Sequence, residues 1–397
     1  MELSPNTPIT VENFEPTQRF LRIAVVTETW PPEVNGVAVT LSQLIQHLGR
    51  RHHTIQLIRP RQDKHDEGQE QIGWSELLLR GLPIPRYPQL KLGLPSKKAL
   101  IKAWSTKRPD LVHIATEGPL SWSALQAAQI LRLPVTSDFR TNFHSYCQHY
   151  GMGWLSKPIV AYLRKFHNRT AFTMVPTQAM KHQLEDMGFK NLRVVARGVD
   201  TNLFHPDKRS EVMRSSWNAT PDTMVLLSVG RLAAEKNLEL TIQTYQALIA
   251  TGRKVKMVFA GDGPMRAMTE SKCPDAVFMG MCTHEQLSTL YASADLLLFP
   301  SLTETFGNVT LEALASATPV LAFDCAAASD FITDHKNGWL IDSNEPHTYI
   351  QRALDITHDA DTLRVAREFT RASVAHLGWD EIAGQMESIF QRAIEVG

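Results

Sequence analysis

The stretch from Ala294 to Phe323 constrains the fold more than any other part of this sequence. It begins with a short apolar run, Leu296 to Phe299, and ends with a second, Val320 to Phe323. Such runs are typical of strands that are buried on both faces of a parallel sheet. Between them, apolar residues recur at helical spacing after the cap-type residues Thr303 and Thr305. The pattern predicts a strand, a polar loop, a helix and a second strand, and open α/β sheets bind ligands at such loops.

This loop and the start of its helix carry two carboxylates, Glu304 and Glu312, with seven residues between them. Phe306, Gly307 and Asn308 would present backbone N–H groups at the positive end of the helix, where phosphate binds readily. Because a carboxylate can accept two hydrogen bonds from neighbouring hydroxyls, the combination fits a sugar nucleotide. The two glutamates alone leave an alternative open, in which Glu312 is a solvated helix residue and Glu304 a loop charge.

The remaining chain is expected to form two α/β domains, each a doubly wound, Rossmann-like parallel sheet. A length of 397 residues favours two or three domains, and 43% hydrophobic with 21% charged residues is ordinary globular composition. The segment Arg197–Pro206 breaks the strand–helix alternation and predicts the boundary. We expect a loose tail over 1–18, domains over 19–200 and 201–378, and a C-terminal helix over 379–397 that packs back on the first domain. The polar segment Arg61–Gln71 is expected to be a mobile loop.

Local hydropathy and cysteine spacing argue against a membrane-spanning protein and against a secreted protein with disulfide bonds. No window approaches the ~20 continuous apolar residues of a membrane-spanning helix, and the N-terminal stretch lacks the apolar core of a signal peptide. The cysteines show no C-x-x-C pairing, which favours free thiols in a reducing cytosol: Cys147, Cys273, Cys282 and Cys325.

A net charge of zero hides a strong asymmetry. Residues 1–200 hold 25 Lys and Arg against 16 Asp and Glu, and residues 201–397 hold 16 against 25. Ser96–Arg108 is free of acids and carries Trp104 among its lysines. Basic charge beside an aromatic residue suits an anionic membrane surface, although a solvated helix face accounts for the pattern equally well. Nucleic-acid binding is not expected, because no recognisable module accompanies the basic half.

Two cations follow the first strand of the second domain. The segment SVGRLAAEKN places Arg231 and Lys236 at the carboxyl end of that strand, just before a helix. Together they could neutralise a diphosphate, since arginine bridges two oxygens and lysine acts as a point charge. The alternative is a pair of surface salt bridges with Glu235 or Glu239.

Glycines elsewhere in the two domains are weaker signals. Gly36 follows the first strand and could let backbone amides approach a phosphate, although a plain turn glycine is the simpler interpretation. The segment Gly261–Pro264 is not a G-x-G-x-x-G dinucleotide fingerprint, because Pro264 ends it. A dehydrogenase is therefore disfavoured.

In order and spacing, the segments PPEVNGVAVT, SVGRLAAEKN, AGDGP and FPSLTETFGNVTLEALASATPV resemble glycosyltransferase family four. The resemblance covers about Leu21 to Ile394, and VHIATEGPLSW, SDFRTNFHSYCQHYG and RGVDTNLFHP are similar to the branch of lipid mannosyltransferases and sulfolipid synthases. It implies the GT-B fold, in which two Rossmann-like domains face a central cleft, and retaining transfer of a sugar from a nucleoside diphosphate.

The resemblance also implies roles for individual residues. Gly36 would approach the donor diphosphate from the first domain, while Arg231 and Lys236 would clamp it from the second. Glu304 would contact hydroxyls of the donor sugar and Glu312 the ribose. Backbone amides of the pair Phe306–Gly307 would reach the phosphate or sugar, and neither a metal nor another cofactor is expected.

One position departs from the family pattern. Related enzymes commonly carry a His-Thr pair near the donor sugar, and the matching register here reads Phe139-Arg140-Thr141. Either Arg140 or His144, four residues on, could take the role of that histidine. With both glutamates assigned to binding, front-face attack is favoured over a covalent glycosyl-enzyme.

These expectations combine into a hexosyltransferase with a nucleoside-diphosphate sugar donor and a lipid or glycan acceptor. GDP-mannose is the preferred donor by resemblance, with a UDP-hexose (glucosyl or sulfoquinovosyl) as the alternative. A sugar-nucleotide epimerase of the same fold and a non-catalytic sugar-nucleotide-binding protein are further alternatives. The expected location is the cytoplasm, with peripheral contact at the inner face of an anionic membrane as an extension of this hypothesis.

Overall fold

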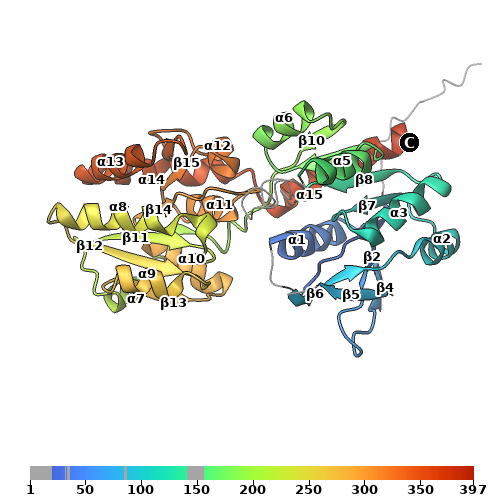
Figure 1. Cartoon of the computed structure of the whole chain (residues 1–397), viewed down its shortest axis with the longest axis horizontal. Helices are drawn as coiled ribbons and strands as arrows, with labels where there is room; N and C mark the ends of the chain where they lie inside the picture. Colours follow the sequence, from blue (N-terminus) through green and yellow to red (C-terminus); the bar gives the residue numbers. More distant parts are fainter. Residues whose placement is uncertain (1–19, 32, 34–35, 85–86, 141–155) are drawn as a thin grey trace, which may run out of the picture.

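Two β-sheets of mainly parallel strands, each with helices on both faces, form the body of the protein (Figure 1). The computed structural model describes residues 20–31, 33, 36–84, 87–140 and 156–397. In the central strand β1 (Arg22–Val26), Ile23 and Val25 pack into one hydrophobic cluster, whereas Ala24 and Val26 pack into another on the opposite face. The continuous apolar runs therefore supply both faces of a sheet, as their pattern predicts.

The first domain has the strand order β10-β9-β8-β7-β1-β2-β4-β3, and the winding direction reverses between β1 and β7. Every neighbouring pair is parallel except β3 and β4. Its other strands are β2 (Thr54–Pro60), β3 (Glu70–Gln71), β4 (Trp74–Leu79), β7 (Leu111–Ile114), β8 (Val135–Asp138), β9 (Phe172–Val175) and β10 (Leu192–Val194), with a separate hairpin of β5 (Gly81–Ile84) and β6 (Tyr87–Gly93). Its helices are α1 (Gly36–Arg50), α2 (Lys97–Thr106), α3 (Pro119–Ile130), α5 (Ser156–His167) and α6 (Gln178–Asp186).

The second domain has the strand order β13-β12-β11-β14-β15-β16, all parallel, which is the 3-2-1-4-5-6 order of a doubly wound sheet. Its strands are β11 (Met224–Val229), β12 (Val255–Ala260), β13 (Val277–Gly280), β14 (Leu296–Phe299), β15 (Val320–Phe323) and β16 (Gly338–Ile341). Its helices are η2 (Pro206–Lys208), α7 (Glu211–Ser216), η3 (Ala234–Lys236), α8 (Leu238–Ala250), α9 (Arg266–Lys272), α10 (His284–Ser293), α11 (Asn308–Ala315), α12 (Ala326–Phe331), α13 (Pro346–His358) and α14 (Ala360–Val374).

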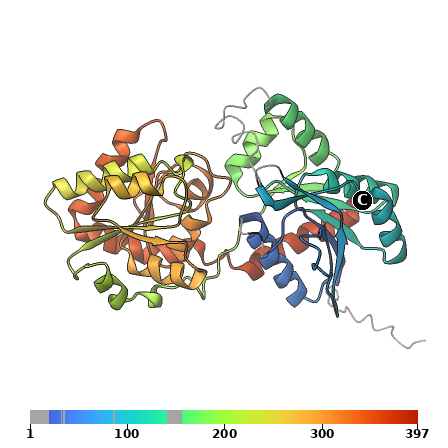
Figure 2. The ribbon, with the colours of Figure 1, turned by 60° about the horizontal axis from the view of Figure 1, so that its bottom comes forward.

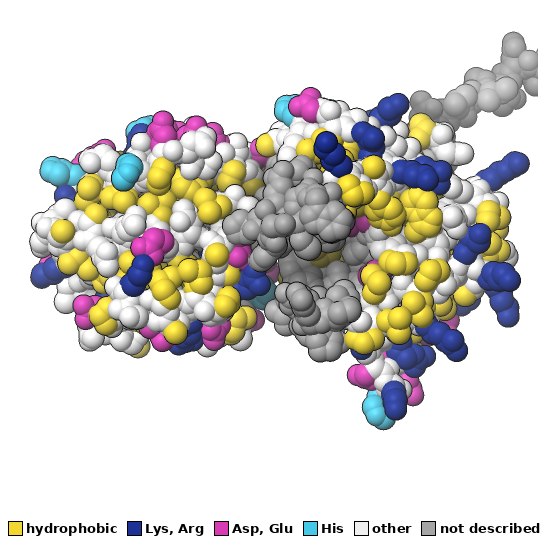
Figure 3. Space-filling model, viewed as in Figure 1, with side chains coloured by type: hydrophobic (Ala, Val, Ile, Leu, Met, Phe, Trp, Pro, Cys, Tyr) yellow, Lys and Arg dark blue, Asp and Glu magenta, His cyan; other side chains and the backbone are white. Residues whose placement is uncertain are grey.

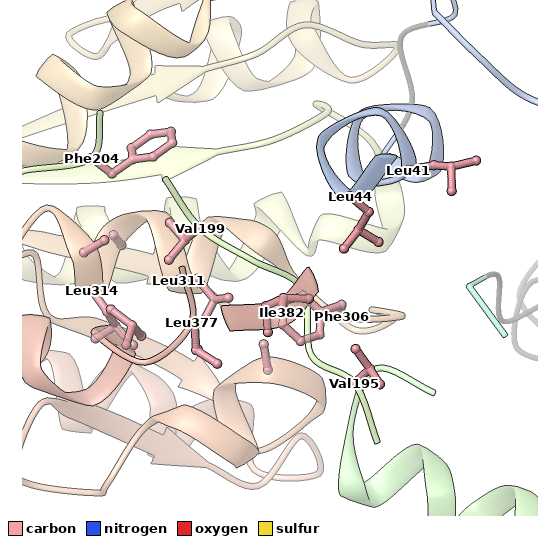
Figure 4. Packing of buried hydrophobic residues seen from close by; sticks show 14 of the residues in the cluster. Leu41, Leu44, Val195, Val199, Phe204, Phe306, Leu311, Leu314, Leu377 and Ile382 are labelled. Atoms are coloured by element: carbon pink, nitrogen blue, oxygen red, sulfur yellow. The ribbon is translucent and has the colours of Figure 1, made fainter. Parts of the chain in front are cut away.

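The C-terminal helix α15 (Trp379–Val396) lies beside α1 of the first domain (Figure 2). Glu387 of α15 accepts a hydrogen bond of 2.8 Å from the Arg51 Nε atom. Gly198, in the linker after β10, has no room for a side chain, because a Cβ there would lie 2.5 Å from the Trp379 ring. One hydrophobic cluster continues through the linker, as seen for Val195 and Phe306 in Figure 4. The helix thus spans the place where the two domains meet.

Ion pairs connect the segment after β2, which the sequence predicts to be a mobile loop, to the sheet. The buried Arg59 guanidinium binds Asp66 at 2.6 Å and Glu76 at 2.9 Å. Strand β4 then pairs in parallel with β2. The sequence WSELLL does not indicate this strand, because it shows neither an alternation of apolar and polar residues nor a fully apolar run. In the structure all six of its residues are half-buried.

The expectation that Trp104 is an exposed membrane anchor is wrong. Trp104 is 0% exposed, and its indole Nε1 donates a 3.0 Å hydrogen bond to Gln56. Leu100 and Trp104 are four residues apart on α2, so both lie on the buried face of that helix. Lys97, Lys98 and Lys102 of α2 are exposed.

Candidate active site

The loops after β11 and β14 meet where the winding of the second sheet reverses, the usual ligand position in such sheets. Lys236, in the loop after β11, pairs through its ammonium group with Glu304 in the loop after β14. Ser301 donates a further hydrogen bond of 2.8 Å to the same Glu304 oxygen. Arg231 forms the salt bridge with Glu235 that the alternative interpretation of these two cations predicts. Lys236 does not follow that alternative, because it pairs with Glu304.

Backbone contacts hold these two loops together. The Leu302 N–H donates to the Glu235 carbonyl at 3.0 Å, and the Ser301 hydroxyl oxygen, whose hydrogen goes to Glu304, lies 3.3 Å from the same carbonyl oxygen. Glycines of the AGDGP segment allow a third loop to pack against the first. A Cβ on Gly261 would lie 1.9 Å from the Gly230 carbonyl oxygen. This segment therefore positions the loop that carries Arg231 and Lys236.

Helix α11 contributes the second glutamate. Glu312 is half-buried and accepts a 2.9 Å hydrogen bond from the Tyr291 hydroxyl. Burial raises the pKa of Glu312, against the opposing effect of that hydrogen bond. The solvated-residue alternative for Glu312 is thus wrong, whereas its predicted contact with a ribose stays a prediction.

The start of α11 differs in detail from the expectation. Its N-cap is Gly307, in the left-handed region at φ 91°, rather than Thr303 or Thr305. Phe306 is 1% exposed and packs in the core, so a ligand contact would have to come from its backbone. Gly307 lies against Glu304, because a Cβ on Gly307 would be 3.8 Å from the Glu304 Cγ atom. The predicted phosphate position and the Lys236–Glu304 pair are therefore neighbours.

The first domain places Arg140 at the end of β8. Its guanidinium binds the Asp138 carboxylate at 2.5 Å, and the His113 Nε2 atom lies 3.1 Å from the same carboxylate. Burial disfavours the Asp138 charge, but Arg140 and His113 outweigh this effect and lower its pKa to about 2. Asp138 thus holds Arg140 in place. His144, the other candidate for the histidine role, lies outside the described residues.

Arg197, which the sequence predicts only as the first residue of the linker, lies among the site residues in the structure. Its Nη1 atom lies 3.4 Å from the Asn308 Oδ1 atom at the start of α11, and its guanidinium lies 5.5 Å from the centre of the Phe306 ring. A Cβ on Gly36 would lie 3.4 Å from the same Nη1 atom. The signal in the sequence is a charged residue directly after the apolar run Val194–Ala196.

A second group that sequence reasoning missed is Glu28, which follows β1. It is 9% exposed, and its carboxylate accepts a 3.0 Å hydrogen bond from the Leu120 N–H of α3. Gly118 makes room for this carboxylate, since a Cβ there would overlap it at 1.9 Å. Burial raises the pKa of Glu28 to about 7, although backbone N–H groups oppose the rise and Glu117 adds to it.

The raised pKa predicts how stability depends on pH. The ordinary value of 4.5 applies to the unfolded chain, so the folded protein binds the proton more tightly and loses stability as pH rises from about 4.5 to 7. Glu28→Gln should therefore raise the free energy of unfolding by roughly 3 kcal/mol at pH 8 and leave it nearly unchanged at pH 4.5. Urea unfolding at both pH values measures this difference. The exposed control Glu67→Gln should change it at neither pH, and a Glu28→Gln effect independent of pH would contradict the assignment.

Within the part of the chain that the structure describes, no helix combines the length and the apolar character of a membrane span. Within the same ranges, no three His, Cys, Asp or Glu side chains gather in a way that could hold a metal ion. The expectation that no metal takes part stays a prediction.

Comparison with known proteins identifies the family. Residues 34–203 match Glycosyltransferase Family 4, and residues 210–373 match glycosyl transferases group 1. A GDP-mannose-dependent alpha-mannosyltransferase of Mycobacterium tuberculosis is 31% identical over 93% of this chain and 97% of its own length. A sulfoquinovosyl transferase of Arabidopsis thaliana is 30% identical over 76% of this chain and 60% of its own length.

Solved structures agree on the fold. A sucrose-phosphate synthase from Thermosynechococcus elongatus superposes with a TM-score of 0.74 at 17% identity, covering 95% of this chain and 100% of that one. HepE from Anabaena, in complex with UDP and glucose, gives 0.71 at 17% identity, covering 94% and 99%. The predicted GT-B fold is confirmed. The chain is therefore a glycosyltransferase and belongs to glycosyltransferase family 4.

Proposed function

We propose that this enzyme transfers mannose from GDP-mannose to a hydroxyl group of a lipid or glycan, with retention of the anomeric configuration. The observation that carries this proposal is the Lys236–Glu304 pair beside the α11 N-terminus, with Gly36 and Arg197 directly across from it. Cations and N–H groups suit a diphosphate, and a neighbouring carboxylate suits sugar hydroxyls. The mannosyltransferase of Mycobacterium tuberculosis, at 31% identity, supports the choice of donor.

The proposed chemistry is front-face attack. The bond between the sugar C1 and the diphosphate oxygen breaks, and a bond from C1 to the acceptor oxygen forms on the same face. The acceptor proton passes to the departing diphosphate, so the protein needs no general base. Arg231, Lys236 and the amides at the α11 N-terminus would stabilise the negative charge that develops on the leaving group.

A panel of nucleotide sugars tests the donor. Release of nucleoside diphosphate should be fastest with GDP-mannose, should depend on a membrane extract as acceptor, and should be unchanged by EDTA. A preference for UDP-glucose or UDP-sulfoquinovose would favour the alternative, which the plant sulfoquinovosyl transferase at 30% identity supports. Conversion of the sugar without an acceptor would instead indicate an epimerase.

We extend the proposal to an acceptor presented at an anionic membrane surface. Figure 3 shows dark blue Lys and Arg side chains spread over the visible face of the first domain, with little magenta. Lys97, Lys98 and Lys102 on α2 are exposed and available to such a surface. The more acidic second domain would be repelled from it, which orients the site toward the lipid.

This extension predicts salt-sensitive binding to anionic vesicles. Each of the three α2 lysines should contribute about 1 kcal/mol, so changing Lys97, Lys98 and Lys102 to Glu should weaken vesicle binding by about 100-fold or more. Co-sedimentation with phosphatidylglycerol and phosphatidylcholine vesicles measures this.

A matched variant reverses three exposed lysines of the second domain and should bind as the wild type does: Lys208, Lys254 and Lys336. If the wild type binds anionic vesicles no better than neutral ones, the proposed membrane contact is refuted, whereas the proposed transfer reaction is not affected.

A further inference from the structure

Arg197 is a buried cation whose environment is built for a partner that the protein itself does not supply. It is 8% exposed, and within the described ranges its Nε atom has no hydrogen-bond partner. Its Nη1 atom reaches only the neutral Asn308 amide oxygen, at 3.4 Å. Burying a charge without a hydrogen-bonded counter-charge is unfavourable, so the position favours a bound anion.

The other cations of the site each form an ion pair with a carboxylate. Arg231 pairs with Glu235, Lys236 with Glu304, and Arg140 with Asp138. Of these four cations, Arg197 alone forms no hydrogen bond to a carboxylate in the described structure. Arg197 therefore supplies the positive charge that no acid neutralises and that would attract a bound dianion. The other three cations are already balanced by acids.

We propose that Arg197 is a donor-binding residue, which contacts the diphosphate from the linker side, opposite Arg231 and Lys236. This inference rests on the proposed function, because it takes the ligand to be a nucleoside-diphosphate sugar. Arginine suits the role because its planar group can bridge two phosphate oxygens. The face of the Phe306 ring, 5.5 Å from the guanidinium carbon, also favours a positive charge at this position.

The position of Arg197 links the donor to both domains. It lies in the linker after β10, beside the first turn of α1 at Gly36 and the first residue of α11, Asn308. Burial, and next the nearby Arg140 charge, lower the Arg197 pKa to about 10, although the charges of Glu304 and Asp138 oppose this effect. Arg197 therefore remains charged at neutral pH. The diphosphate would thus be held from the first domain and the linker as well as from the second domain.

The test compares ligands with and without phosphates. Calorimetry with GDP and GDP-mannose, and competition with guanosine, are carried out on the wild type and on Arg197→Gln, Arg197→Lys and Arg193→Gln. Arg197→Gln should weaken binding of GDP and GDP-mannose by about 10-fold to 100-fold and leave guanosine unchanged. Arg197→Lys should recover part of the loss, and it replaces Arg197→Gln if that variant does not fold. Arg193 is exposed on β10, so its variant should match the wild type.

Other results would overturn the assignment. Equal GDP affinity in the wild type and Arg197→Gln would show that Arg197 does not touch the diphosphate, and an equal loss for guanosine would indicate a purely structural role. A raised KM for the acceptor at unchanged donor affinity would place an acceptor anion at Arg197 instead. If the wild type binds UDP in place of GDP, uridine ligands are substituted. If it binds no nucleoside diphosphate, the proposed function fails together with this inference.

Discussion

Lys236→Ala should lower kcat/KM for glycosyl transfer by about 100-fold, the cost expected when one preorganised charge is removed from a leaving group. Lys236 pairs with Glu304 in the structure, so among the described residues the substitution leaves that carboxylate hydrogen-bonded to Ser301 alone and facing the phosphates. Both effects oppose the build-up of negative charge. Arg231→Ala should lower kcat/KM by a similar factor, because it also removes a positive charge that stabilises the leaving group.

Steady-state kinetics with a saturating acceptor measure this loss, and thermal unfolding checks that the variants remain folded. Lys254→Ala is the matched control, because Lys254 is an exposed lysine of the same domain that pairs with Asp222 away from the site. Near-normal turnover in both Lys236→Ala and Arg231→Ala would refute the diphosphate clamp.

Gly261→Ala should be the most damaging single change to the donor loops. A Cβ there would lie 1.9 Å from the Gly230 carbonyl oxygen, and the residue has φ 133°. Because the obstacle is backbone, the two loops must separate. We expect a loss of roughly 3 kcal/mol in the free energy of unfolding, together with weaker donor binding, since the displaced loop carries Arg231 and Lys236.

Gly252→Ala separates backbone strain from the clash. Gly252 also has positive φ, at 79°, but a Cβ there meets no atom within 4 Å. It should cost about 1 kcal/mol and leave donor affinity unchanged. Urea unfolding and donor calorimetry on both variants measure these effects. Equal losses in the two would show that loop packing at Gly261 contributes nothing.

The strands of both sheets could be predicted because fully buried parallel strands are continuous apolar runs. Leu296–Phe299 and Val320–Phe323 became β14 and β15 at those bounds. Strand β4 could not be predicted this way, since it is half-buried throughout and is held by the Arg59 ion pairs. The prediction for Trp104 is wrong because a run of basic charge does not show which face of a helix is buried, whereas the four-residue spacing of Leu100 and Trp104 assigns both to the core.

For the site, sequence motifs identified residues close along the chain but not the partners that the fold supplies. The loop glutamate Glu304 and the cation Lys236 are 68 residues apart and form one ion pair. Arg197 escaped notice because its importance depends on α1 and α11 converging on the linker, which no local pattern records. Residue type and spacing indicate the chemistry, whereas burial and long-range contacts determine which charges lack a partner.

The central claim is retaining transfer from GDP-mannose, and the anomeric configuration of the product tests it most directly. The purified enzyme is incubated with GDP-mannose and a lipid acceptor fraction, and the product is examined by NMR while GDP release is counted. We expect one GDP released for each mannosyl group transferred, and an α-linked mannoside as the product. A β-linked product, or no transfer from GDP-mannose under conditions where a UDP-hexose is used, would contradict the claim.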